Sequence, residues 1–222
     1  MSDMVESVKK EVLVKLRWRE GMYLIVKRVI DILGSLFGII LLFPIFLLIG
    51  VVIKLEDPTG PVFYAHQRLG KSGTFIPVYK FRSMYQNADK MIDSFTEEQK
   101  KEYQENFKLK NDPRVTKVGK ILRKTSLDEL PQLLNVLKGE MSIVGPRPIV
   151  TAELEKYAGY EELLLSVPPG LTGMWQAFGR SDISYEERVQ MDVEYVKKRS
   201  FSLDFKVVIY TVVSVIKGTG AY

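Results

Sequence analysis

An uncharged apolar run from Ile32 to Ile53 constrains this chain more than any other feature. It matches the roughly 20 residues that a helix needs to cross a bilayer. The run starts far from Met1 and is followed by Lys54-Leu55-Glu56-Asp57-Pro58 rather than by a small-residue cleavage site. We therefore expect a membrane segment that is retained, not a cleaved signal peptide.

Pro44, near the middle of this run, predicts a kinked helix, since it removes a backbone hydrogen bond and clashes with the preceding turn. Basic residues flank the run on both sides, whereas positive charge normally marks one side of a membrane. They are Lys15, Arg17, Arg19, Lys27 and Arg28 before it and Lys54, Arg68, Lys71, Lys80 and Arg82 after it. This pattern fits a re-entrant helix that returns to the same face, and a crossing helix with a tolerated proline stays open.

The segment Val5 to Tyr23 alternates apolar residues with Lys and Arg around Trp18. This spacing favours a helix lying on anionic headgroups, and a surface helix packed on the domain is the alternative.

The lack of cysteine excludes disulfides and thiolate metal sites, and the single histidine, His66, excludes a multi-histidine site. Any metal must bind oxygen ligands, which favours magnesium or manganese. The net charge of +5 fits nucleic acid, anionic lipid or phosphorylated substrates equally well.

Pro61 to Gln67 and Thr74 to Phe81 are rich in strand-forming residues and predict a β-hairpin closed by Gly70 to Gly73. Lys80 and Arg82 would share one face, either meeting phosphate or forming a basic strand edge. The stretch from Ala65 to Ser72 imitates a phosphate-binding loop but lacks its first glycine, so we reject a nucleotide triphosphatase.

The remaining segments are mostly helical by pattern. Asn87 to Lys110 is a charged helical excursion, a candidate mobile cover over a site, and we expect helices at Val150 to Tyr157 and Ser184 to Arg199. Pro168 to Gly170 predicts a turn. The apolar stretch from Phe201 to Gly218 predicts a core or interfacial helix, although its Val, Ile and Thr content leaves a strand open.

An adjacent acid pair, Asp128-Glu129, indicates phosphoryl chemistry, because one carboxylate can attack phosphorus while the other holds a divalent cation. Ser126 and Glu129 also fit a capping box. Pro131 favours Asp128 as the cap instead, because the proline then falls in the first turn. Either register predicts both acids at a helix N-terminus, where phosphate also binds.

Cations for such a site are abundant between Asp112 and Pro148. The candidates are Arg114, Lys117, Lys120, Arg123, Lys124 and Arg147. Arg147 stands between Pro146 and Pro148, whose fixed backbone angles would orient its guanidinium for a diphosphate. A rigid surface turn with a solvated arginine is the alternative.

Six ordered motifs together resemble the bacterial sugar transferase family, the monotopic phosphoglycosyl transferases. They are Lys80-Phe81-Arg82-Ser83-Met84, Asp112-Pro113-Arg114, Ser126 to Gln132, Gly145-Pro146-Arg147-Pro148, Pro169 to Gly173 and Gly179-Arg180. The resemblance runs from the Pro44 segment to Tyr222, which is similar to the catalytic core of larger exopolysaccharide-priming enzymes. Phe43 departs from the serine that often precedes the family's proline.

The resemblance implies transfer of a hexose 1-phosphate from a UDP-sugar to undecaprenyl phosphate, releasing UMP. It implies Asp128 as nucleophile, Glu129 as the Mg²⁺ ligand and Arg147 facing the nucleotide diphosphate. We also expect Lys80, Arg82, Arg114 and Arg123 to bind the substrate. Together with Asp128, Glu129 and Arg147 they form the predicted site.

The implied fold is α+β: a mostly helical, membrane-associated domain with a re-entrant membrane helix, a small β-hairpin and interfacial amphipathic helices. We divide the chain into an interfacial segment (1–28), a re-entrant helix broken at Pro44 (29–55) and a catalytic domain (56–222). The expected location is the cytoplasmic face of the bacterial inner membrane.

Two other functions are compatible with the sequence. A non-catalytic membrane scaffold for polysaccharide assembly would use the acid pair only as a helix cap. A nucleic-acid binder has less support, because the basic residues are dispersed without a binding module, and we expect no nucleic-acid partner. A homodimer is plausible.

Overall fold

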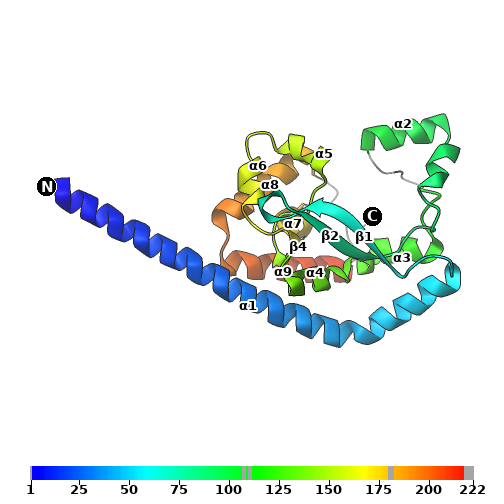
Figure 1. The fold of residues 1–222 in the computed structure, drawn as a ribbon, viewed down its shortest axis with the longest axis horizontal. Helices are drawn as coiled ribbons and strands as arrows, with labels where there is room; N and C mark the ends of the chain where they lie inside the picture. Colours follow the sequence, from blue (N-terminus) through cyan, green and yellow to red (C-terminus); the bar gives the residue numbers. More distant parts are fainter. Residues whose placement is uncertain (1, 107–108, 110–111, 180–182, 218–222) are drawn as a thin grey trace.

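The computed structural model describes residues 2–106, 109, 112–179 and 183–217. They form a mostly helical α+β fold in which a long N-terminal helix runs beneath a compact body of short elements (Figure 1). This confirms the predicted class. Arg180 of the Gly179-Arg180 motif and the last residues, 218–222, lie outside the described part.

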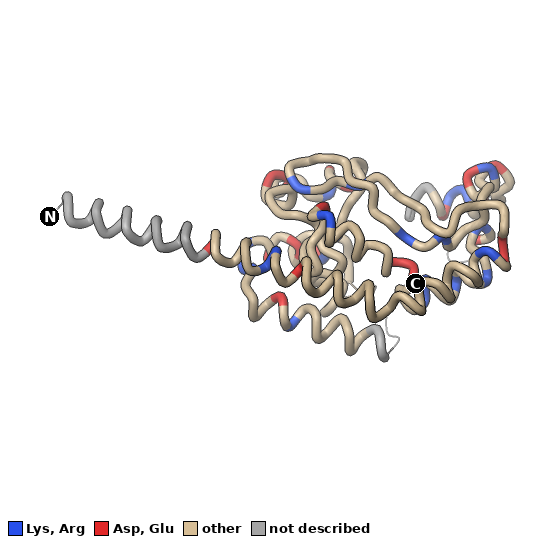
Figure 2. Tube along the Cα trace, turned by 60° about the horizontal axis from the view of Figure 1, so that its bottom comes forward, with Lys and Arg blue, Asp and Glu red and all other residues tan. Residues whose placement is uncertain are grey.

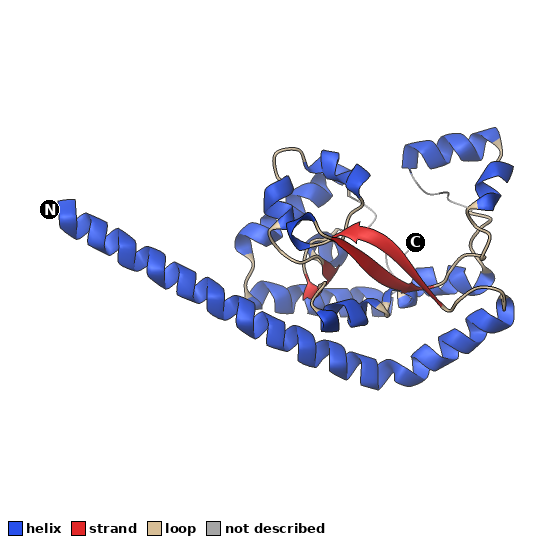
Figure 3. Cartoon of the chain, in the orientation of Figure 1, coloured by secondary structure: helices blue, strands red, loops and turns tan. Residues whose placement is uncertain are grey.

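Helix α1 (Ser2–Glu56) is continuous and contains Pro44. It bends in its second half while remaining helical (Figures 1 and 3). Its portion from Glu20 to Glu56 is long and apolar enough to cross a membrane, and its middle is free of charged residues (Figure 2). The boundary expected between residues 28 and 29 falls inside this helix, and the side chains of residues 2–19, Trp18 included, are not described.

Polar contacts attach the part of α1 before Pro44 to the body. Lys27 Nζ donates to Asp204 Oδ2 at 2.8 Å, and the backbone N–H of Ile143 donates to Asp31 Oδ1 at 2.9 Å. Arg28 donates to the carbonyls of Val136 and Leu137.

Beyond Pro44, α1 is attached by apolar packing and by Glu56, which accepts hydrogen bonds from the backbone N–H groups of Lys117 and Val118. Ile49 and Ile53 are buried against Phe81 and Leu122. Most other large apolar side chains of α1 are exposed, Phe37, Ile40 and Leu48 among them. The helix therefore contacts the body at both of its halves and leaves an apolar surface outside.

The predicted hairpin is confirmed. Strands β1 (Phe63–Leu69) and β2 (Phe75–Phe81) are antiparallel, joined through the short 3₁₀ turn η1 (Lys71–Gly73). Gly73 has φ +74°, which an L side chain adopts only with strain. A strand, β2, follows the 65–72 segment, whereas a nucleotide triphosphatase would have a helix there.

A second, smaller sheet was not predicted. Strand β3 (Ser142–Val144) pairs in parallel with β4 (Gly170–Thr172). The turn predicted at Pro168 to Gly170 is therefore wrong, because this segment runs extended into β4. A Cβ on Gly170 would lie 2.1 Å from the backbone nitrogen of Gly145, so the close approach of these two chains requires glycine.

The remaining elements are short helices and turns. In chain order they are η2 (Lys90–Ser94), α2 (Glu97–Asn106), α3 (Lys117–Thr125), η3 (Leu127–Glu129), α4 (Gln132–Lys138), α5 (Thr151–Leu154), η4 (Glu155–Tyr157), α6 (Glu161–Leu165), α7 (Met174–Phe178), α8 (Tyr185–Lys198) and α9 (Phe201–Lys217).

These helices confirm most of the patterns read along the chain. Helix α8 starts at a capping box formed by Ser184 and Glu187. The final apolar stretch, for which helix and strand were both open, is helix α9. Its Val207 packs into a core with Val144, Tyr195 and Val196. The charged excursion is helical at η2 and α2.

Candidate active site

The acid pair lies in η3, a single 3₁₀ turn between α3 and α4. Ser126, with φ +57°, ends α3 in the left-handed conformation and redirects the chain. No side-chain capping hydrogen bond is made by Ser126, and α4 starts after Pro131 without one. The predicted caps at Ser126 and Asp128 are therefore wrong: the acids precede α4, but their carboxylates are not used to cap it.

Lys80 of β2 lies between the two carboxylates. Its Nζ donates to Glu129 Oε1 at 2.6 Å and lies 3.9 Å from Asp128 Oδ2. The hairpin thus brings a cation from 49 residues earlier in the chain to the acid pair. The predicted grouping of Lys80 with Asp128 and Glu129 agrees with this geometry.

The two acids have opposite pKa shifts. Asp128 is 7% exposed, and burial raises its pKa to about 6, with Glu129 adding to the shift and Lys80 and Arg123 opposing it. Burial also disfavours the Glu129 carboxylate, but Lys80, Arg147 and Gln132 outweigh it and lower the pKa of Glu129. Neighbouring groups with separated pKa values suit different roles in one site.

Arg123 of α3 lies near Asp128, whereas Arg114 is paired with Asp112. Arg123 Nε donates to Ser83 Oγ at 2.9 Å, and its charge acts on Asp128. Arg114 is buried and donates to Asp112 Oδ2 at 2.7 Å, with its guanidinium over the rings of Phe95 and Tyr103. Because its donors face Asp112, Arg114 is held in a structural ion pair.

Arg82, which follows β2, is also held in a structural ion pair. It is 7% exposed and forms an ion pair with Asp57, whose backbone carbonyl accepts a second hydrogen bond at 2.6 Å. Asp57 directly follows α1, so this pair ties the end of the long helix to the hairpin. Unlike Lys80, Arg82 does not line the pocket described next.

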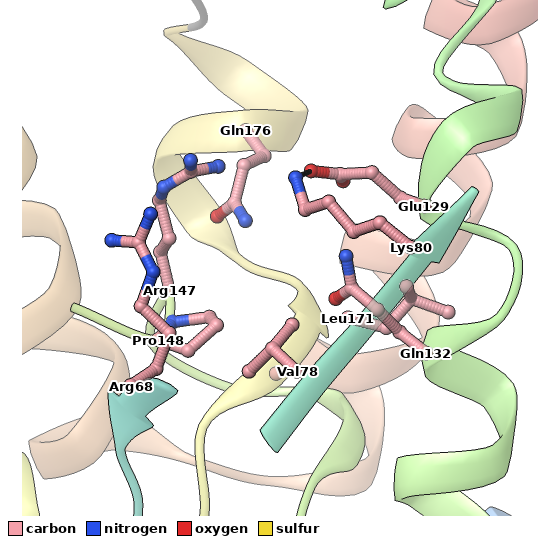
Figure 4. A pocket seen from close by; sticks show the side chains of 10 residues that line it. Arg68, Val78, Lys80, Glu129, Gln132, Arg147, Pro148, Leu171 and Gln176 are labelled. Carbon is pink, nitrogen blue, oxygen red and sulfur yellow. Dashed lines mark hydrogen bonds and ion pairs between the residues drawn. The ribbon is translucent and has the colours of Figure 1, made fainter. Parts of the chain in front are cut away.

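A small pocket opens beside the acid pair (Figure 4). Lys80 and Glu129 lie on one side, Arg68 and Arg147 on the other, and Gln176 between them. The remaining lining residues are Val78, Gln132, Pro148, Gly170 and Leu171. Two predicted motifs, Gly145 to Pro148 and Pro169 to Gly173, thereby meet the acids at one pocket.

Arg147 reaches the pocket from the segment that follows β3. Its guanidinium lies 5.8 Å from the Trp175 ring, whose other neighbour is Arg188 at 4.8 Å. Within the described residues, the Arg147 side chain forms no ion pair. Its charge remains directed to the pocket and to Glu129.

Arg68, Gln132 and Gln176 line the pocket but were not among the predicted site residues. The hairpin register contained a signal for Arg68: Tyr64 pairs with Lys80, His66 with Val78 and Arg68 with Ile76. Residues paired in this way share one face, so Arg68 lies on the Lys80 face. No pattern in the local sequence pointed to Gln176.

Comparison with known proteins shows the family of this chain. Residues 22–218 match the model of the family described as bacterial sugar transferase. The chain is 46% identical over 199 residues to the exopolysaccharide production protein ExoY of Sinorhizobium fredii, with 88% of each chain covered.

Larger relatives match over part of their length. The undecaprenyl-phosphate galactose phosphotransferase of Salmonella typhimurium is 45% identical over 88% of this chain and 41% of its own length. The UDP-glucose:undecaprenyl-phosphate glucose-1-phosphate transferase of Escherichia coli is 40% identical over 91% of this chain and 42% of its own. With the acid pair, its lysine and the arginine-lined pocket in one place, the chain belongs to the bacterial sugar transferase family.

Proposed function

We propose that this protein transfers a hexose 1-phosphate from a UDP-sugar to undecaprenyl phosphate, the priming step of exopolysaccharide or other cell-surface glycan synthesis. The observation that carries the proposal is the Asp128-Glu129 pair bridged by Lys80 at the edge of an arginine-lined pocket. The names of the relatives, which include both galactose and glucose phosphotransferases, support this reaction class.

Asp128 is the nucleophile in the proposed reaction. Its carboxylate attacks the β-phosphorus of the UDP-sugar, and the bond from that phosphorus to the bridging oxygen of UMP breaks. An oxygen of undecaprenyl phosphate then attacks the same phosphorus, which displaces Asp128 and leaves a lipid-linked diphosphosugar. The second step regenerates the ionised carboxylate, and neither step changes an oxidation state.

The charged neighbours of Asp128 have complementary tasks. Lys80 and Arg123 stabilise negative charge as it develops on the phosphoryl oxygens. Arg147 contacts the nucleotide part, on the side of the pocket opposite Lys80. Arg82 and Arg114, which are paired with Asp57 and Asp112, hold the strand and loop that surround the site rather than the substrate.

The donor set fits Mg²⁺ bound together with substrate. In the described part of the chain, no group of three or more His, Cys, Asp or Glu could hold a metal. Mg²⁺ is usually held by one or two carboxylates, water and substrate phosphates, and Glu129 beside Asp128 offers that arrangement. Bound Mg²⁺ would neutralise phosphate charge, with Glu129 as its protein ligand once Lys80 turns to the phosphate.

The site is proposed to lie at headgroup height on the cytoplasmic face of the inner membrane. The kinked α1 would enter and leave the same leaflet, consistent with Pro44 inside the helix and Lys54 in its last turn. Helix α9 exposes Phe205, Ile209 and Val212, which would place it in the interface. The lipid phosphate would then reach Asp128 from the membrane side.

The decisive experiment incubates purified protein with Mg²⁺ and a panel of UDP-sugars and measures UMP release. In the absence of lipid acceptor, a phosphosugar should be found on Asp128 by mass spectrometry, and Asp128→Asn should abolish both signals. Absence of the adduct would refute the covalent step.

Size measurement in detergent at several concentrations tests the expected homodimer.

The scaffold alternative is tested by Glu129→Gln. Its premise, that the acids only cap a helix, has lost support because neither carboxylate caps α4. A scaffold should tolerate the substitution, whereas the transferase should lose activity and Mg²⁺ dependence together.

A further inference from the structure

Two arginines from distant parts of the chain face the same pocket. Arg68, near the end of β1, and Arg147, from the segment after β3, run along the same side of it (Figure 4). Burial and the neighbouring charge of Arg147 lower the pKa of Arg68. Two guanidinium groups on one side of a pocket favour an anion bound between them.

Their carboxylate partners do not balance this charge. Arg68 Nη1 is 3.2 Å from Glu153 Oε2, but the same oxygen also accepts from the backbone N–H of Val150 at 3.0 Å. Arg147 contributes its charge without an ion-pair partner among the described residues. Arg68 therefore shares its one ion-pair partner with a backbone donor, while Arg147 acts on the carboxylates of Glu129 and Asp192 without an ion pair to either.

A backbone hydrogen bond joins the two segments that carry Arg68 and Arg147. The backbone N–H of Leu69 donates to the carbonyl of Ile149 at 2.8 Å, which joins the residue after Arg68 to the segment that carries Arg147. His66 Nδ1 lies 3.2 Å from Arg68 Nη2 and, as an acceptor, would orient that guanidinium. Burial and the charges of Arg68 and Lys80 lower the pKa of His66, which keeps it neutral and able to accept.

Gln176 adds a polar group between the two sides. Its side-chain oxygen is buried and has no hydrogen-bond partner in the described structure, although the residue lines the pocket. Buried polar atoms are normally satisfied, so this oxygen indicates that a ligand with a donor group enters here. A sugar hydroxyl is such a donor, whereas a bare phosphate is not.

We propose that Arg68 is the second arm of a two-arginine clamp that, with Arg147, binds the diphosphate of the nucleotide donor. The proposal rests on the function proposed above and adds a substrate-binding residue to it. Guanidinium forks bind phosphate oxygens in pairs, so two arginines match the two phosphates of a nucleoside diphosphate better than the single phosphate of its monophosphate product. The clamp would hold the donor and weaken its grip once UMP has separated.

The test measures nucleotide binding by calorimetry with UDP and UMP as probes, using the full-length protein in detergent with Mg²⁺. Arg68→Gln should weaken UDP binding at least about tenfold and UMP binding less than about threefold, since one phosphate engages fewer guanidinium donors. Arg68→Lys, which keeps the charge but lacks the fork, should recover part of the loss. Lys156→Gln removes an equal charge outside the pocket and serves as the matched control.

The outcomes separate the clamp from the proposed function. Equal UDP affinity in wild type and Arg68→Gln, with UMP release by the wild type intact, overturns the clamp alone. Equal losses for UDP and UMP also overturn it, because they indicate a general electrostatic effect. No UDP binding and no UMP release by the wild type overturn both proposals. Thermal unfolding of Arg68→Lys beside wild type establishes that the variant is folded.

Discussion

The ammonium of Lys80 is 2.6 Å from Glu129 Oε1 and 3.9 Å from Asp128 Oδ2, so one cation contacts both members of the acid pair. The contact joins the end of the hairpin to the turn before α4. The two carboxylates therefore have different electrostatic surroundings. Glu129 makes the shorter contact with the lysine, and Asp128 is more deeply buried.

Replacing Lys80 by Met should raise the pKa of Asp128 further above its value of about 6, since a stabilising cation is lost while Glu129 stays nearby. At pH 7 the ionised fraction of Asp128, and with it the rate of transfer, should fall about twofold for one unit of added shift and about tenfold for two units. The measurement is the pH profile of kcat/KM. Lys138→Met is the control, because Lys138 contacts the Tyr79 ring and neither acid. An unshifted profile would show that Lys80 does not act on Asp128.

Activity should rise with pH up to about 6 and then level off. The nucleophile must be ionised, and burial raises the pKa of Asp128 to about 6, so protonation removes the reactive form below that value. Each pH unit below 6 should then cost about tenfold in kcat/KM. Rapid-quench measurement of UMP release at low donor concentration reports this limb. A flat profile from pH 4.5 to 7 would contradict the assignment.

Arg28 should couple α1 to the catalytic body. Its Nη1 donates to the carbonyl of Val136 at 2.6 Å and its Nη2 to that of Leu137 at 2.8 Å, which satisfies the C-terminal end of α4. Arg28→Leu should lower stability by about 2 kcal/mol, the scale of hydrogen bonds from a charged group. Thermal unfolding in detergent checks this, with Lys54→Gln as a control from the same helix. Equal midpoints would mean that these bonds contribute nothing.

Gly119 should not tolerate even alanine. A Cβ at this position would lie 2.0 Å from the backbone carbonyl oxygen of Ser83, and such overpacking costs about 1–3 kcal/mol. Gly119→Ala should lower the unfolding temperature and also transfer, because Arg123 bonds to Ser83 on the same contact. Gly21→Ala, at a helical glycine with open space, should be neutral or slightly stabilising. Similar behaviour of the two variants would contradict the close approach.

Local patterns were enough to predict several elements. Strand-forming residues on both sides of Gly70 to Gly73 predicted the hairpin that carries Lys80, and a helix was predicted from Ser184 to Arg199, where α8 is found. These features depend on residues near in sequence, so their physical causes are present in a short window. The parallel β3–β4 pair was missed because it joins segments that are far apart and only three residues long.

The sequence by itself determined the apolar N-terminal helix, the hairpin and the acid pair with its phosphoryl chemistry, since each depends on composition or short-range spacing. Only the tertiary structure decided which cations serve that chemistry. Arg82 and Arg114 are paired with Asp57 and Asp112, whereas Lys80 and Arg147 meet at the pocket, joined by the unpredicted Arg68. The physical reason is that charged residues look alike along a chain, and their partners are selected by packing between distant segments.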